Sequence, residues 1–290
     1  MMKRPSENLN PWGTFPQRNK PNRFAKPGWI SIFYFLIPLL VLSKWSGCGN
    51  PDAYQILDTP HQVIDLWGKS RVYTLYRPPG QKKLPLLVYF HGVMSEGFKN
   101  IPALKNYTGS PVEETGLIEF CKRQGIILLV PRSAYRYTFL NQEATGWLPF
   151  NKEIDGIEKM IDLVVEKYPV SSNGIYLVGI SAGAGMCHHL ANRRPDFYNT
   201  ILSHSQGYVG QDNILLKPTV EGPRFGVVFC FTRGDYDNLI DICIQSEKIY
   251  RKSGYRTVLL KNLPPKSHSW SRESNRRFWR YMQNVGRKQN

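Results

Sequence analysis

The stretch "GISAGAG", residues 179–185, carries a G-x-S-x-G pattern around Ser181. A serine hydroxyl attacks a carbonyl only when a base removes its proton, and that base needs an acid to orient it. The pattern by itself recurs by chance, so it counts only where a buried strand precedes it and a helix follows. Here "GIYLVGIS" indicates a strand and "GAGMCHHLANRR" has helical character, which predicts a sharp turn that presents Ser181 as a nucleophile.

The base is expected late in the chain, because this strand–turn–helix context carries its groups in the order serine, acid, histidine. Four histidines come after the motif: His188, His189, His204 and His268. The first two fall in the helix after the motif, and the third precedes every candidate acid. His268 stands in "PPKSHSW", a loop after the last predicted strand, and is the expected base.

The acid is expected in "GDYDN", the loop between a predicted strand and the next helix. Asp235 and Asp237 both qualify by position, whereas Asp241 already lies inside the helix. We expect Asp237 to orient His268, because it follows the strand-ending Gly234 by three residues and has room to turn back toward the sheet. Asp235 is the alternative acid, and its competing role is that of a turn or cap residue.

Negative charge that develops on a substrate oxygen needs two backbone N–H donors, an arrangement called an oxyanion hole. The amide of Ala182, next after the nucleophile, supplies the first donor. The second is expected from the loop after "LLVYFHG", at Val93 or Met94, and we take Val93 as that donor. Gly92 lets the backbone approach closely, and His91 is expected to hold the loop.

A glycine-rich loop that binds phosphate is the rival interpretation of the motif. The stretch lacks the G-K-[ST] ending of a P-loop, and "GAGMCH" lacks the third glycine of a dinucleotide fingerprint. No zinc-ligand spacing appears, so we expect neither a metal nor a cofactor. The formal net charge is +16, but no RNA-binding signature accompanies it, and nucleic acid is not an expected partner.

The elements that position these residues alternate between strands and helices from about residue 61 onward. Continuous apolar runs such as "LPLLVYF", "GIILLVP" and "GVVFCF" indicate strands buried on both faces of a sheet. Residues 110–125 and 152–168 are typical of helices, the first with Ser110 as N-cap and Gly125 as terminator. We predict an α/β fold with a mostly parallel central sheet and helices on both faces.

The sequence also predicts where this domain begins and how its edge is built. Gly68-Lys69-Ser70 between two apolar runs predicts an antiparallel hairpin at the N-terminal edge of the sheet. One domain is expected over residues 52–286, with its longest loops at 93–110 and 133–151.

Residues 1–50 are expected to be an export signal or a membrane anchor. "GWISIFYFLIPLLVLS" is an uncharged apolar run near the length of a signal-peptide core and short for a membrane span. Basic residues precede it, as an export signal requires. "SGC" at 46–48 is similar to the end of a bacterial lipobox, although Lys44 and Trp45 depart from that pattern. Lipidation of Cys48 and tethering outside the cytoplasm are expected, with plain cleavage or a simple anchor as alternatives.

Two further sets of residues have open roles. Four cysteines would be free to pair in an exported protein, or would be buried free thiols: Cys121, Cys187, Cys230 and Cys243. Five aromatic residues lie in loops near predicted strand ends, where they would stack on a substrate or pack the loops: Tyr135, Trp147, Tyr208, Tyr236 and Trp270.

Together these stretches resemble the α/β-hydrolase superfamily, and within it the secreted esterases that include polyhydroxybutyrate depolymerases, feruloyl esterases and acetylxylan esterases. The resemblance covers about residues 71–270 and includes "LLVYFHG", "GIYLVGISAGAGMCHHLANRRPDFY", "FTRGDYDN" and "SHSW". Ala184 stands where the family often has a second glycine, and "SSNG" replaces a common aspartate before the motif strand. Neither departure touches the expected serine, acid or histidine.

The resemblance implies a serine esterase that needs no cofactor, with Ser181, His268 and Asp237 as its triad and Val93 and Ala182 as its oxyanion donors. It implies an ester substrate linked to carbohydrate or polyester, and it leaves the acyl and alcohol groups open. Acyl transfer or peptide hydrolysis by the same triad is an alternative. A non-catalytic, surface-anchored binding protein on the same scaffold is another.

Overall fold

The computed structural model describes residues 55–56, 63–64, 70–80, 82–100, 107–147, 150–210, 214–218 and 225–286. These residues belong to one compact unit, Asp52–Asn290. The predicted export segment, residues 1–50, and the lipidation candidate Cys48 lie outside the described residues, so both stay predictions. Within the described ranges, no helix combines the length and the hydropathy needed to cross a bilayer.

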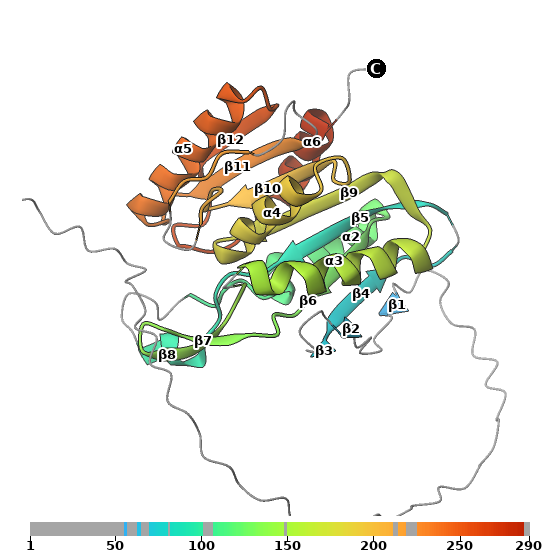
Figure 1. Ribbon diagram of the computed structural model, residues 1–290, viewed down its shortest axis with the longest axis horizontal. Coiled ribbons are helices and arrows are strands. Elements are labelled where there is room, and N and C mark those ends of the chain that lie inside the picture. Colours follow the sequence, from blue (N-terminus) through green and yellow to red (C-terminus); the bar gives the residue numbers. More distant parts are fainter. Residues whose placement is uncertain are drawn as a thin grey trace, which may run out of the picture. The chain divides into compact units, whose positions relative to one another are not determined.

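An eight-stranded sheet forms the centre of this unit, in the order β1-β4-β6-β5-β9-β10-β11-β12 (Figure 1). Neighbouring strands from β6 to β12 are parallel, whereas β4 is antiparallel to β6 and β1 is antiparallel to β4. The predicted α/β fold with a mostly parallel sheet is confirmed. The strands are β1 (Gln55–Ile56), β4 (Tyr73–Arg77), β5 (Leu84–Phe90), β6 (Ile127–Pro131), β9 (Val170–Ile180), β10 (Thr200–His204), β11 (Gly226–Thr232) and β12 (Thr257–Leu263).

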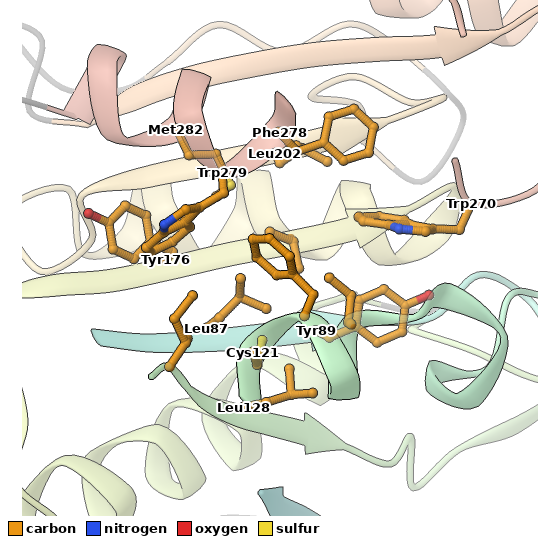
Figure 2. Close-up of a cluster of buried hydrophobic side chains, with 14 of the residues drawn as sticks. Leu87, Tyr89, Cys121, Leu128, Tyr176, Leu202, Trp270, Phe278, Trp279 and Met282 are labelled. Carbon is orange, nitrogen blue, oxygen red and sulfur yellow. The ribbon is translucent and has the colours of Figure 1, made fainter. Parts of the chain in front are cut away.

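Helices cover both faces of the sheet, as predicted. One buried cluster joins α2, the sheet strands and α6, and Figure 2 shows Cys121, Leu128, Leu202 and Phe278 of this cluster. On the other face α3 packs against α4 and β6, α4 packs against β9, and α5 packs against β11 and β12 (Figure 1). The helices are α2 (Leu117–Gln124), α3 (Phe150–Lys167), α4 (Ala182–Arg193), α5 (Asp237–Lys252) and α6 (Asn275–Gly286), with the 3-10 helices η1 (Glu96–Asn100) and η2 (Arg272–Ser274).

The helix predicted over residues 110–125 is interrupted. It forms α1 (Val112–Thr115) and α2, because Gly116 between them has a φ of 66°. Gly125 ends α2 with a φ of 64°, as predicted. Ser110 is not the N-cap, and its hydroxyl instead accepts a hydrogen bond of 3.0 Å from the amide of Trp270.

Two hairpins form small sheets apart from the central one. The predicted N-terminal hairpin is present as β2 (Val63–Ile64) paired with β3 (Ser70–Arg71), but it forms a small sheet of its own, and the antiparallel edge of the central sheet is β4 with β1. A second hairpin, β7 (Arg136–Phe139) with β8 (Gln142–Thr145), lies in a region predicted as loop. Its turn, Leu140-Asn141, has positive φ at both residues, which Asn-Gly or Asp-Gly would normally signal.

The four cysteines of the described part are free and buried, so none of them forms a disulfide: Cys121, Cys187, Cys230 and Cys243. Burial raises the pKa of each thiol well above its ordinary value. These side chains therefore behave as small apolar groups of the core.

Candidate active site

Ser181 lies in the turn between β9 and α4 with a φ of 54° and a ψ of −125°, a conformation that costs energy for any residue except glycine. Glycines make the turn possible. A Cβ on Gly179 would come within 2.4 Å of the Gly183 carbonyl carbon, and a Cβ on Gly183 within 2.2 Å of the Phe90 carbonyl oxygen. The predicted strand–turn–helix context is therefore present, and it lifts Ser181 out at the carboxyl edge of the sheet.

His268 lies in the loop between β12 and α6, and its Nδ1 is 2.6 Å from Oδ1 of Asp235. The second carboxylate oxygen of Asp235 accepts hydrogen bonds from the Ser205 hydroxyl (2.6 Å) and the Thr232 amide (2.5 Å). Burial acts to raise the pKa of Asp235, but the hydrogen bond from His268 and the other contacts outweigh it and lower that pKa. The carboxylate is therefore ionised, and it orients the imidazole so that Nε2 is the nitrogen that can take a proton.

The structure pairs His268 with Asp235, so the expectation that Asp237 holds this position is wrong. The hydrogen bond from the Thr232 amide closes a turn that carries the Asp235 side chain inward. Asp237 is the first residue of α5 and is exposed, where a carboxylate favours the positive end of the helix. The prediction was wrong because β11 ends at Thr232, two residues before the Gly234 taken as the strand end.

The loop that carries His268 is fixed against its surroundings on both sides. The Thr232 hydroxyl donates a hydrogen bond of 2.8 Å to the Ser267 carbonyl. On the other side, the Trp270 amide is held by the Ser110 hydroxyl, and the Trp270 ring reaches into the buried cluster (Figure 2). These contacts restrict the positions that His268 can adopt.

Of the two expected oxyanion donors, Ala182 directly follows the nucleophile, and Val93 belongs to the loop after β5. The loop after β5 touches Ser181, because a Cβ on Gly92 would stand 3.5 Å from the Ser181 Cβ. The Gly92 amide donates a hydrogen bond of 2.8 Å to the Gly109 carbonyl, which fixes the loop and the following amide of Val93. Ala182 begins α4, where first-turn N–H groups have no carbonyl partner within the helix.

His204 and Ser205, at the end of β10, form a chain of hydrogen bonds to Asp235. The single proton of the Ser205 hydroxyl goes to Asp235, so His204 Nδ1, 2.7 Å from that hydroxyl, acts as the donor to it. Burial lowers the pKa of His204 to about 4, so this imidazole is neutral. The chain order excluded His204 as the base, and no sequence pattern indicated Ser205. Their position at the end of a strand next to β9 and β11 is the signal that could have found them.

The other histidines after the motif have packing partners. His188 Nδ1 lies 2.9 Å from the Tyr250 hydroxyl and its Nε2 3.0 Å from the Ser203 hydroxyl. His189 Nε2 lies 2.9 Å from the Val209 carbonyl oxygen. Neither histidine contacts His268 or Asp235 through a hydrogen bond among the described residues.

Most of the aromatic loop residues pack the loops. Trp147, Tyr208 and Trp270 are buried. Trp147 donates a hydrogen bond of 2.7 Å to the His91 carbonyl and so holds the loop after β5. Tyr236 differs, because it is 40 % exposed and its ring centroid lies 5.4 Å from that of His268.

A cavity of about 360 Å³ lies beside the loop after β5. Residues of β4 and β6 line it together with His91, Met94 and Thr145. Ser181, Asp235 and His268 are not among its lining residues, so this cavity is separate from the centre of the site.

No protein-family model and no curated protein sequence matches the chain. The structure is similar to an S-formylglutathione hydrolase from Agrobacterium tumefaciens, with 12% identity, a TM-score of 0.56 and coverage of 78% of this chain and 93% of that one. An S-formylglutathione hydrolase from Staphylococcus aureus shares 14% identity, with a TM-score of 0.52 and coverage of 81% and 99%.

A candidate dipeptidyl aminopeptidase IV from Bacteroides ovatus gives a TM-score of 0.54 at 15% identity. That match covers 78% of this chain and only 34% of the other, so the chain spans about a third of that protein. At these identities the similarity establishes the fold. The protein has the α/β-hydrolase fold, and the predicted resemblance is confirmed at that level.

Proposed function

We propose that the protein is a serine ester hydrolase in which Ser181 attacks, His268 transfers the proton and Asp235 orients His268. The observation that carries the proposal is the pair of His268 and Asp235, 2.6 Å apart, at the sheet edge where Ser181 stands in its turn. The loops that bring in these groups follow β9, β11 and β12, and they converge at the edge where open α/β sheets bind ligands.

The proposed reaction follows from this arrangement. His268 Nε2 takes the Ser181 proton as the serine oxygen attacks the ester carbonyl, and then gives it to the leaving alcohol. Asp235 stays ionised and stabilises the imidazolium that forms. The amides of Val93 and Ala182 stabilise the tetrahedral oxyanion, and water repeats the sequence to release the acid.

The sequence resemblance and the N-terminal segment support a narrower proposal on substrate and place. Carbohydrate-linked esters or polyesters are the proposed substrates, and the proposed location is outside the cytoplasm with a lipid or peptide anchor at the N-terminus. Acyl transfer and peptide hydrolysis would use the same triad, and product analysis with alcohol, sugar and peptide substrates separates them from ester hydrolysis.

Replacement of the nucleophile tests the proposal. Ser181→Ala is expected to lower kcat for p-nitrophenyl acetate by at least about 10³-fold, because alanine has no hydroxyl that could form the acyl-enzyme. It is also expected to abolish labelling by a fluorophosphonate, measured by intact mass. Ser253→Ala, an exposed serine at the end of α5, serves as the matched control and should keep both properties. Retained turnover or labelling in Ser181→Ala would contradict the assignment.

A further inference from the structure

The nucleophile and the base do not touch through a hydrogen bond in this conformation. The imidazole of His268 bonds to Asp235, and among the described residues no hydrogen bond joins it to the Ser181 hydroxyl. Ser181 is 2 % exposed and His268 is 7 % exposed. Both side chains are therefore covered by other groups of the protein.

Tyr107 lies next to both His268 and Ser181. Its ring centroid lies 5.0 Å from that of His268, with the two planes inclined by 32°. Its hydroxyl oxygen stands 2.3 Å from the place that a Cβ on Gly92 would take, and that place is 3.5 Å from the Ser181 Cβ. The phenol therefore lies along the imidazole and ends beside the nucleophile.

The Tyr107 hydroxyl faces the groups that would bind a substrate oxygen. Burial raises the pKa of Tyr107, and the Ser181 hydroxyl and the Val93 backbone act to lower it. Val93 follows Gly92 in the chain, so its backbone lies next to this hydroxyl. The Tyr107 hydroxyl is buried and has no hydrogen-bond partner among the described residues. Its contacts with Ser181 and Val93 therefore lack full hydrogen-bond geometry.

We propose that the Tyr107 hydroxyl occupies the oxyanion subsite and that a substrate carbonyl must displace it before Ser181 can react. This inference rests on the proposed function. The Tyr107 hydroxyl lies between Gly92 and Ser181, next to the expected oxyanion donor Val93, and a substrate oxygen cannot share that position with it. A buried hydroxyl without a partner is unfavourable, so a carbonyl that receives full hydrogen bonds can displace it, but the Tyr107 ring has to move first.

A third oxyanion donor is the rival role for the same hydroxyl, and the two roles predict opposite results. A donor is lost in Tyr107→Phe and in Tyr107→Ala alike, so both variants would be slower. An obstacle is removed in Tyr107→Ala, which would then be faster, while Tyr107→Phe would lose no catalytic contact.

The test measures the second-order rate constant of Ser181 labelling by a short-chain and a long-chain alkyl fluorophosphonate. Tyr107→Ala is expected to react about three- to tenfold faster than the wild type, because the competent state no longer has to be formed at a cost. Tyr107→Phe is expected to be no slower than the wild type. The gain should be equal for both probes, since the obstacle lies at the reacting oxygen and not along the chain-binding region.

Tyr137→Phe is the matched control for Tyr107→Phe. Its hydroxyl is also buried without a partner among the described residues, but it faces Gly146, whose Cβ would stand 2.6 Å away. Its labelling rate should equal that of the wild type. Thermal unfolding of every variant shows that a change in rate does not come from loss of the fold.

Three results would overturn the inference: a Tyr107→Phe rate at least about tenfold slower, which assigns a donor, a gain limited to the long-chain probe, or no gain in folded Tyr107→Ala. If neither the wild type nor Tyr107→Ala is labelled, the proposed function itself fails. If the wild type is labelled at Ser181 and Tyr107→Ala gains nothing, only the present inference fails.

Discussion

Asp235 and Asp237 lie two residues apart and have opposite environments. Asp235 accepts hydrogen bonds from His268, Ser205 and Thr232, whereas the Asp237 side chain is exposed at the start of α5. Asp235→Asn is expected to lower kcat for p-nitrophenyl acetate by about 10²- to 10⁴-fold, because the amide no longer fixes the tautomer of His268 or stabilises its charged form.

Asp237→Asn is the matched control, because it makes the same chemical change on the exposed face. We expect it to keep kcat within about twofold, as a surface substitution away from the site would. A larger loss of kcat in Asp237→Asn than in Asp235→Asn would restore the acid that the sequence favoured.

The order of residues along the chain was enough to find Ser181 and His268 at the carboxyl edge of the sheet. Ser181 follows a buried strand and precedes a helix, and His268 follows the last predicted strand. The acid was missed by two residues, because that choice depended on where β11 ends and no residue type marks that point. No sequence pattern identifies Tyr107 as a residue of the site. Its contacts with His268 and the Gly92 loop exist only through the packing of segments far apart in the chain.

The turn between β9 and α4 depends on backbone contact with the loop after β5. A Cβ on Gly183 would come within 2.2 Å of the Phe90 carbonyl oxygen and 2.5 Å of the His91 carbonyl oxygen. Gly183→Ala is therefore expected to lower the free energy of unfolding by about 1–3 kcal/mol, as overpacking does, and to lower kcat by moving α4 away from the strand ends.

Gly210→Ala is the control for Gly183→Ala. A Cβ at Gly210 would meet atoms only at 3.9 Å, an ordinary contact, so urea unfolding should show little change. Gly183→Ala with the stability and kcat of the wild type would mean that the turn tolerates a side chain at residue 183 and does not depend on close backbone contact.

Apolar runs predicted the strands and amphipathic runs predicted the long helices, because burial on one or two faces leaves a period in the sequence. The predictions of secondary structure that were wrong depend on local backbone geometry. Gly116 at a φ of 66° divides a helix whose polar and apolar pattern is continuous. The β7–β8 turn adopts positive φ at Leu140 and Asn141, and this pair of residues is not typical of a hairpin turn of that kind.

At the scale of the whole molecule, three buried histidines couple the fold to pH. Burial lowers the pKa of His91 to about 4, of His188 to about 3 and of His204 to about 4. In the unfolded chain each would titrate near about 6.5. Between these values the unfolded state binds protons that the folded state does not, so stability is full above about pH 6.5 and falls as the pH is lowered toward about 4.

Urea unfolding between about pH 8 and pH 4.5 checks this expectation, and each histidine contributes at most about 1.4 kcal/mol per pH unit to the slope. His188→Gln should be less stable than the wild type near pH 8, because it loses the contacts to Tyr250 and Ser203. Its free energy of unfolding should also depend less steeply on pH. A free energy that stays constant across this range in the wild type would show that these imidazoles do not stay neutral in the folded state.

The burial of the four thiols of α2, α4, β11 and α5 determines when these cysteines can be oxidised. A folded chain presents none of them as a thiolate, and so an oxidant finds nothing to modify at these four places. A chain that opens exposes sulfur at widely separated points and becomes liable to wrong cross-links. Oxidative damage at these cysteines would therefore record which molecules had once come apart, whereas intact ones pass unmarked between reducing and oxidising surroundings.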